Sequence, residues 1–108
     1  MFKKKHIHFI GIGGIGMSGI AQVLHKKGFK VSGSDLSQNP IVKKLKRKMK
    51  IFNSHNADNI NNADIIVYSS AIKKNNIEIL TAKKLKIPVF SRAMMLAQVM
   101  RLKSSITV

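Results

Sequence analysis

The segment Gly11-Ile-Gly-Gly-Ile-Gly16 has the residue types and spacing of a loop that binds a diphosphate. It follows an apolar run and opens a helical pattern, so its backbone N–H groups and the positive end of the helix could hold an anion. Gly11 would take the tight turn, Gly13 would let the backbone approach a pyrophosphate, and Gly16 would let the helix pack on the sheet. The segment from Gly14 to Gly19 fits the same pattern, but we expect the regular strand to end at Ile10, directly before Gly11, which favours the first frame. We expect Gly19 to serve close packing of the helix.

An acidic side chain lies after the second strand pattern, where a dinucleotide-type site places the carboxylate that binds the ribose. Asp35 lies 24 residues beyond Gly11 and directly follows a second short strand pattern. A carboxylate at this place can accept hydrogen bonds from two ribose hydroxyls. Pyrophosphate and ribose are shared by NAD, FAD and nucleoside-diphosphate sugars, so spacing alone leaves these ligand classes open.

Further polar residues fall at what would be the same edge of the sheet. His55 lies in a polar loop after a third strand pattern, and Ser69-Ser-Ala71 ends a fourth. All could face a ligand, although the serines could equally cap a helix. His6 and His8 share one face of the first strand, where we expect packing or hydrogen bonding rather than a metal. No Ser-His-Asp set, paired carboxylates or Gly-Lys-Ser/Thr loop occurs, which predicts no catalytic residue and no metal site.

Apolar runs and helical periodicities alternate along the chain, and these elements must position the polar residues. The runs predict strands at residues 6–12, 30–34, 51–52, 64–68 and 88–90. The periodic patterns predict helices at 15–27, 40–48, 76–86 and after an N-cap at Ser91, with one helical turn within 53–63. Strands and helices that alternate in this way form βαβ units. The predicted fold is α/β, a Rossmann-like parallel sheet of about five strands with helices on both faces.

Each predicted helix has an apolar face that should pack against the sheet. The expected core residues, helix by helix, are Ile20, Val23 and Leu24; Ile41, Leu45 and Met49; Ile77, Leu80 and Leu85; and Met95, Leu96 and Val99. Residues 104–108 resume a strand-like pattern and are expected to begin another strand.

The chain is strongly basic, with 20 Lys and Arg against 4 Asp and Glu in 108 residues and a formal net charge of +16. Such a charge invites a nucleic-acid interpretation. Only Arg47, Arg92 and Arg101 are arginines, however, and the lysines are spread over every predicted helix, so we expect no specific nucleic-acid partner. The absence of cysteine excludes disulfides and thiol catalysis and fits a cytoplasmic protein. No apolar run is long enough to cross a bilayer, so no membrane partner is expected.

Longer stretches around these residues resemble a known family. They are His8 to Ala21 with its Gly-Gly-Ile-Gly-Met-Ser-Gly centre, Val31-Ser-Gly-Ser-Asp35, Tyr68-Ser-Ser-Ala-Ile72, Ile87-Pro-Val89 and Arg92-Ala-Met-Met-Leu-Ala97. In order and spacing they are similar to the amino-terminal domain of the Mur ligases that join L-alanine to UDP-N-acetylmuramate in peptidoglycan synthesis. Dehydrogenases share the glycines but not the Met-Ser-Gly-Ile-Ala continuation.

The resemblance implies the UDP-N-acetylmuramate-binding domain of an ATP-dependent, ADP-forming ligase. Asp35 would lie beside the uridine, Arg92 would meet the phosphates, and the cleft would also be lined by His55, Ser69, Ser70 and Ala71. The residues implied to hold the diphosphate are Gly11, Gly13, Gly14, Ile15, Gly16, Met17 and Ser18. Two alternatives stay open: an NAD-binding domain of a dehydrogenase, and a basic nucleic-acid-binding module.

Members of this family have one domain for the UDP-sugar, a central ATPase domain and a carboxyl-terminal domain for the amino acid. Residues 1–103 would form the first, and residues 104–108 would begin the first strand of the central domain. ATP and Mg²⁺ would bind in the central domain, so no cofactor is expected in this chain, and the chain alone is expected to be inactive. The two other domains would be its partners. Ser54 and Met94 depart from the family's usual glycine and glutamate.

Overall fold

The computed structural model describes the backbone of residues 5–106 and the side chains of residues 5–101. Its strands are β1 (His6–Ile10), β2 (Lys30–Ser34), β3 (Lys50–Phe52), β4 (Ile65–Tyr68) and β5 (Val89–Ser91). They form one sheet in the order β3-β2-β1-β4-β5, and every neighbouring pair is parallel. The chain runs outward from β1 to β3, then returns to the other side of β1. A topological switch point, where ligands bind in such sheets, therefore lies between β1 and β4.

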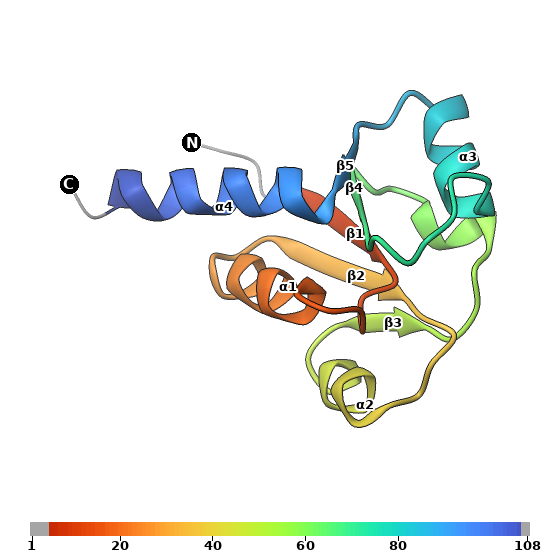
Figure 1. Cartoon of the computed structure of the whole chain (residues 1–108), viewed down its shortest axis with the longest axis horizontal. Helices are drawn as coiled ribbons and strands as arrows, with labels where there is room; N and C mark the ends of the chain where they lie inside the picture. The colour runs from red at the N-terminus through yellow and green to blue at the C-terminus, as the bar shows by residue number, and fades with distance from the viewer. Residues whose placement is uncertain (1–4, 107–108) are drawn as a thin grey trace.

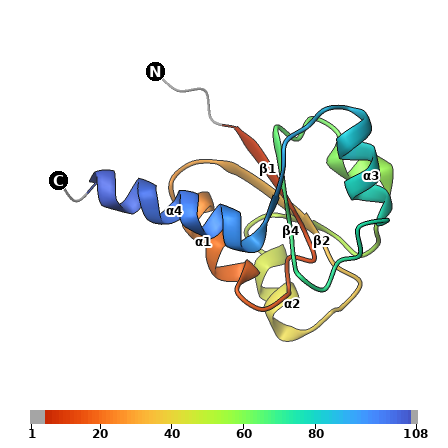
Figure 2. The ribbon, with the colours of Figure 1, turned by 45° about the horizontal axis from the view of Figure 1, so that its top comes forward.

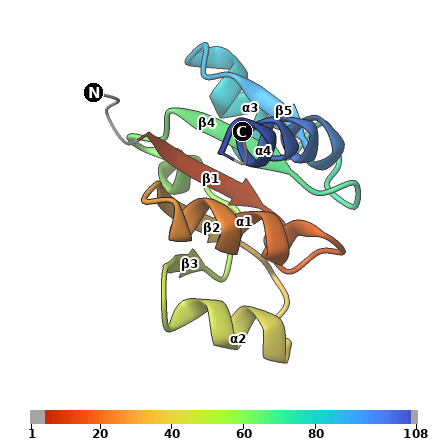
Figure 3. The same ribbon diagram turned by 90° about the vertical axis from the view of Figure 1, so that its left-hand side faces the viewer.

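Helices cover both faces of this sheet. They are α1 (Met17–Lys26), α2 (Pro40–Lys46), the 3₁₀ turn η1 (Ala57–Ile60), α3 (Ile77–Lys84) and α4 (Arg92–Ile106). α1, α2 and α4 lie on one face, and α3 and η1 lie on the other (Figures 1 and 3). The last turns of α4 extend beyond the sheet (Figure 2). The predicted α/β class, with five parallel strands and helices on both faces, is confirmed. In residues 5–106, no helix has the length and apolar character needed to span a membrane.

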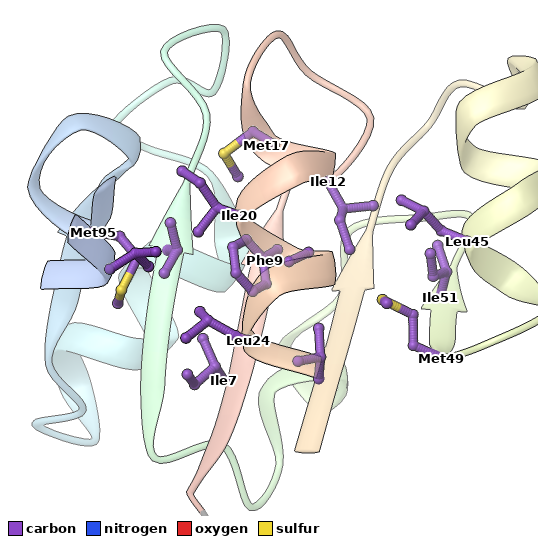
Figure 4. Packing of buried hydrophobic residues seen from close by; sticks show 14 of the residues in the cluster. Ile7, Phe9, Ile12, Met17, Ile20, Leu24, Leu45, Met49, Ile51 and Met95 are labelled. Carbon is purple, nitrogen blue, oxygen red and sulfur yellow. The ribbon is translucent and has the colours of Figure 1, made fainter. Parts of the chain in front are cut away.

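The larger apolar core fills the space between the sheet and α1, α2 and α4. Phe9 of β1 lies at its centre between Ile20 and Leu24 of α1 (Figure 4). Met95 and Val99 of α4 extend the same core and are buried. Because residues 7 and 9 of β1 point to this face, residues 8 and 10 point to α3.

The predicted apolar face of α3 is wrong. Ile77, Leu80 and Leu85 are between 45 % and 56 % exposed, while Glu78, Ile79 and Ala82 are the buried residues. The helix has only eight residues, and Asn76 caps it by accepting a 2.9 Å hydrogen bond from the N–H of Glu78. A short helix gives a weak periodic signal, and pattern analysis places a charged residue outside. Here the charged residue is inside because polar partners surround it, as described below.

Smaller corrections apply to α2 and α4. On α2, Val42 is buried in place of the expected Ile41, and on α4 Leu96 is 39 % exposed. The N-cap predicted at Ser91 is confirmed, since its Oγ accepts a 3.2 Å hydrogen bond from the N–H of Met94.

The carboxyl-terminal helix also runs further than expected. α4 continues through Ile106, so residues 104–106 are helical rather than the start of a strand. A single strand without a neighbour leaves its backbone groups unpaired, whereas a helix pairs them internally. Residues 107–108 lie outside the described residues. The expected beginning of a second domain remains a prediction.

Candidate functional site

The glycine-containing loop joins β1 to α1 at the carboxyl edge of the sheet. Gly11 has a φ of +77°, a left-handed conformation that glycine adopts without strain. The N–H groups of Gly11 and Ile12 both donate to the carbonyl oxygen of Ser34, at 2.7 and 3.1 Å. These bonds fix the start of the loop to the end of β2. The tight turn predicted at Gly11 is confirmed.

Asp35 holds the same loop from the β2 side. Its Oδ2 accepts a 2.8 Å hydrogen bond from the N–H of Gly13, and its Oδ1 accepts one of 2.8 Å from the N–H of Ser37. A Cβ atom at position 13 would lie 2.6 Å from Cγ2 of Val42 and 2.9 Å from Asp35 Oδ2. Glycine is therefore required here by the close approach of Val42 and Asp35, and the expected approach to a pyrophosphate stays a prediction. Each carboxylate oxygen keeps a second lone pair for a ligand.

An open cleft of about 290 Å³ lies over this loop. The end of β4 forms its opposite wall, where a Cβ atom on Gly14 would come within 2.7 Å of Ser69 Oγ. The lining residues are Gly11, Gly13, Gly14, Asp35, Leu36, Ser37, Asn39, His55, Ser69, Ala71 and Ile72. The structure thus brings together predicted site residues from four separate segments: the β1–α1 loop, the end of β2, the polar region after β3 and the polar region after β4.

Other predicted site residues lie outside this cleft. Ile15 is 96 % exposed, and Ser70 is also exposed and does not line the cleft. The side chain of Met17 is fully buried in the apolar core, and its N–H donates to the carbonyl oxygen of Gly14 at 3.0 Å. Met17 therefore anchors the loop to the apolar core and does not face the cleft.

A second open cleft of about 320 Å³ lies between α1 and α4 and contains Gly16 and Arg92. A Cβ atom on Gly16 would lie 3.1 Å from Cδ and 3.3 Å from Nη1 of Arg92, so the close neighbour of Gly16 is this arginine and not the sheet. Gly19 lines the same cleft, and a Cβ atom there would meet no heavy atom within 4 Å in the described part of the chain. The close packing expected at Gly19 is wrong.

The amino end of α1 supplies the donors for an anion. Hydrogen bonds within the described residues use the N–H groups of positions 11–14 and of Met17. They leave the N–H groups of Ile15, Gly16 and Ser18, at the positive end of the helix dipole. Arg92 stands beside them. Free N–H groups at a helix amino end, with an arginine beside Gly16, are an arrangement that can bind an anion such as a diphosphate.

A buried carboxylate, that of Glu78 on α3, lies beneath the cleft. Glu78 is fully buried, and burial alone would raise the pKa of its carboxyl group. Hydrogen bonds from His8, Asn59 and Ser34, together with the attraction of His8, outweigh burial and hold the pKa below its ordinary value. Oε1 of Glu78 lies 2.6 Å from Nε2 of His8 and 2.9 Å from Oγ of Ser34. Oε2 lies 3.0 Å from Nδ1 of His55, 3.1 Å from Nδ2 of Asn59 and 3.2 Å from the backbone nitrogen of Asn56.

The histidines of β1 belong to the same network. Ser32 Oγ lies 2.8 Å from Nδ1 of His8 and 2.7 Å from Nε2 of His6, so both histidines are hydrogen bonded as expected. In residues 5–101, no group of three or more acidic or histidine side chains is arranged so that it could hold a metal ion. A signal for Glu78 was present in the sequence. His8, Ser32 and Ser34 occupy alternate strand positions, and such a polar stripe inside a covered sheet needs a polar partner on the facing helix.

Ser54 precedes His55 without strain. Its φ angle is not positive, so the backbone does not require glycine at this position. Its carbonyl oxygen accepts a 2.7 Å hydrogen bond from Nδ2 of Asn59, which fixes the loop that carries His55.

Comparison with known proteins follows the same residues. Residues 6–104 match the family described as "Mur ligase family, catalytic domain". The UDP-N-acetylmuramate–L-alanine ligase of Ruthia magnifica is 52 % identical over 111 residues, which cover 100 % of this chain and 24 % of that protein. The chain thus spans about a quarter of the length of the relatives it matches.

Solved structures agree. UDP-N-acetylmuramate-alanine ligase MurC from Thermotoga maritima superposes with a TM-score of 0.85 and 32 % identity, over 90 % of this chain and 23 % of that one. The UDP-N-acetylmuramate:L-alanyl-gamma-D-glutamyl-meso-diaminopimelate ligase from Neisseria meningitides superposes with a TM-score of 0.80 and 29 % sequence identity. The superposition covers 89 % of this chain and 31 % of that one. Shikimate dehydrogenase from Aquifex aeolicus, with a TM-score of 0.53 and 21 % sequence identity, shares the fold alone. With a family match over nearly all of its residues, the chain belongs to the Mur ligase family.

Proposed function

We propose that this chain binds UDP-N-acetylmuramate for a ligase that joins L-alanine to it in peptidoglycan synthesis. The observation that carries the proposal is the glycine-loop cleft with Asp35 and His55 on its walls, in a chain 52 % identical to such a ligase along its whole length. The uridine would occupy this cleft, with Asp35 accepting hydrogen bonds from the ribose. The diphosphate would lie at the amino end of α1, bound by the N–H groups of Ile15, Gly16 and Ser18 and by Arg92.

The chemistry of ligation is assigned to parts of the full-length enzyme outside this chain. There ATP would activate the muramate carboxylate, and the amine of L-alanine would attack the resulting acyl phosphate in the cytoplasm. Within residues 5–101 no cluster of acidic or histidine side chains suits Mg²⁺, and the sequence has no Gly-Lys-Ser/Thr loop for ATP. The work of this chain is to hold the nucleotide so that the muramate reaches the other domains.

The basic surface is proposed to be non-specific. Lysines stand in the last turns of α1, α2 and α3, which lie on both faces of the sheet. A nucleic-acid site would gather its cations on one surface.

Calorimetric titration with UDP-N-acetylmuramate, UDP and NADH tests the proposal. We expect both uridine nucleotides to bind and NADH to bind more weakly. Asp35→Ala should weaken UDP-N-acetylmuramate binding by about 1.5–3 kcal/mol, the range for hydrogen bonds to a charged group. Asp58→Ala, which removes the same charge from the exposed surface of η1, is the matched control and should leave the affinity unchanged. Tighter binding of NADH than of UDP would establish the dehydrogenase alternative instead.

A further inference from the structure

The buried hydrogen bonds beneath the cleft fix where protons must be. Four of them form a chain from the carbonyl oxygen of Asn62 through His6, Ser32 and His8 to Glu78. The successive distances are 3.1, 2.7, 2.8 and 2.6 Å. The carbonyl at one end and the ionised carboxylate at the other can only accept. Each of the four bonds therefore needs a hydrogen from the two imidazoles or the hydroxyl between them.

Neutral side chains cannot supply enough hydrogens. Two neutral imidazoles carry one N–H each and Ser32 carries one O–H, which makes three hydrogens for four bonds. One of the two rings must hold a second proton. Burial lowers the pKa of His6, and repulsion from Lys30 and His8 acts in the same direction, against the opposing effects of the Asn62 carbonyl and Asp64. The additional proton is therefore on His8, which is fully buried with Nε2 2.6 Å from Glu78.

The second carboxylate oxygen of Glu78 determines which ring nitrogen of His55 carries a hydrogen. Nδ1 of His55 lies 3.0 Å from Glu78 Oε2 and 3.1 Å from Ser34 Oγ. The hydroxyl hydrogen of Ser34 is directed to Glu78 Oε1, so Nδ1 of His55 must carry the hydrogen in both contacts. A neutral His55 with its one hydrogen on Nδ1 satisfies both contacts. Nε2 of His55 then has a free lone pair, and it has no hydrogen-bond partner within residues 5–101.

We propose that Glu78 is a positioning residue for ligand recognition: paired with a protonated His8, it holds the Nδ1–H of a neutral His55 and so presents Nε2 to the cleft as a hydrogen-bond acceptor. This inference rests on the proposed function for the identity of the ligand. In a UDP-sugar, the hydroxyls and the uracil N–H can donate to such an acceptor, while the diphosphate offers only acceptors. Because His55 and Asp35 line the same cleft, His55 recognises the uridine part and not the diphosphate.

Nitrogen-15 NMR of the imidazole rings in the ligand-free chain at pH 7 tests the assignment without any ligand. We expect hydrogens on both nitrogens of His8 and on Nδ1 alone in His55. In Glu78→Gln, His8 should lose its second proton and the Nε2–H form of His55 should become populated. A wild-type His55 with its hydrogen on Nε2, or a neutral His8, overturns the inference whether or not the variant folds.

Binding of UDP and of pyrophosphate completes the test. Glu78→Gln should weaken UDP binding about three- to tenfold, the value of one hydrogen bond, and leave pyrophosphate binding unchanged. Asp58→Ala removes an exposed carboxylate of η1 that has no part in the network and is the control, with the His55 ring signals and UDP affinity unchanged. An equal loss for UDP and pyrophosphate contradicts the inference. Failure of UDP to bind the wild-type chain would contradict the proposed function. The position of the hydrogen on His55 is decided separately, by the ring signals of the ligand-free chain.

Discussion

The two faces of the sheet are built differently, although the same strands form both. On the face of α1, α2 and α4, apolar side chains such as Phe9 and Leu24 make a continuous core. On the face of α3, a smaller apolar cluster around Ile66 lies beside the polar network of His8 and Glu78. The first face supplies the stability on which the loop rests. The second extends polar contacts from the interior to His55, so the site depends on the less apolar face.

The largest loss of stability is expected from Glu78→Ala. Removal of one partner from a buried, hydrogen-bonded pair leaves His8 without its counter-charge and should cost about 3–5 kcal/mol at pH 7. The pKa of Glu78 in the folded protein lies below its ordinary value of 4.5. Its ionised form therefore stabilises the fold above about pH 4.5, and this contribution is lost as pH falls through the folded-state pKa. Urea unfolding from pH 7 to pH 3 should show the difference between wild type and variant shrinking in acid. A difference independent of pH would contradict the assigned ion pair.

Leu24→Ala makes the corresponding change on the apolar face. Loss of the transfer free energy and the cavity left behind should cost about 3 kcal/mol. No titratable group contributes to this contact, so the loss should be the same at pH 7 and at pH 3 when measured by the same urea unfolding. A loss that shrinks in acid as it does for Glu78→Ala would mean that the two faces are not distinct.

Two glycine substitutions distinguish the loop from the helix that follows it. Gly13→Ala should destabilise the chain by about 1–3 kcal/mol, because the methyl group meets Val42 and the Asp35 carboxylate. Gly19→Ala should stabilise it by about 0.5–1 kcal/mol, since the site is open and alanine favours the helix. Chemical denaturation of both variants checks the signs. Destabilisation by Gly19→Ala would show that another surface packs there in solution.

The smallest effect is expected at the start of α4. Ser91 already accepts from the N–H of Met94, so Met94→Glu should complete a reciprocal capping box. We expect a gain of about 0.5 kcal/mol and a rise of roughly 2–4 °C in the thermal midpoint. Met94→Gln, which can make the same hydrogen bond without the charge, is the control for attraction to the helix dipole. An unchanged midpoint in both variants would show that the side chain does not reach back to the cap.

The apolar face was predictable because its signals are local. Alternation along β1 and the spacing of Ile20 and Leu24 on α1 depend on neighbouring residues only. The glycine turn and the nearness of Asp35 to it were equally predictable, because the carboxyl ends of parallel strands meet at one edge. The individual contacts were not. That Asp35 fixes Gly13 and that Arg92 stands over Gly16 depend on side-chain positions that spacing does not encode.

The α3 face was mispredicted because its determinants are long-range. Glu78 is 70 residues from His8 in sequence and is buried only because His8, Ser34 and Asn59 supply its hydrogen bonds. Treated as a local pattern, α3 should have turned Glu78 outward and Ile77 and Leu80 inward, and the structure shows the reverse. The cost of burying a charge depends on partners that lie on other strands.

The central claim is that the glycine-loop cleft binds the nucleotide of UDP-N-acetylmuramate. Titration of the nitrogen-15-labelled chain with this ligand, followed through the backbone amide signals, tests it most directly. We predict saturable shifts at Gly11, Gly13, Gly16 and Asp35, with the signals of Lys44 on α2 and Lys83 on α3 unchanged. NADH should produce only weak shifts at the same concentrations. Shifts confined to the lysine-bearing helices, or stronger shifts of the loop with NADH, would contradict the claim.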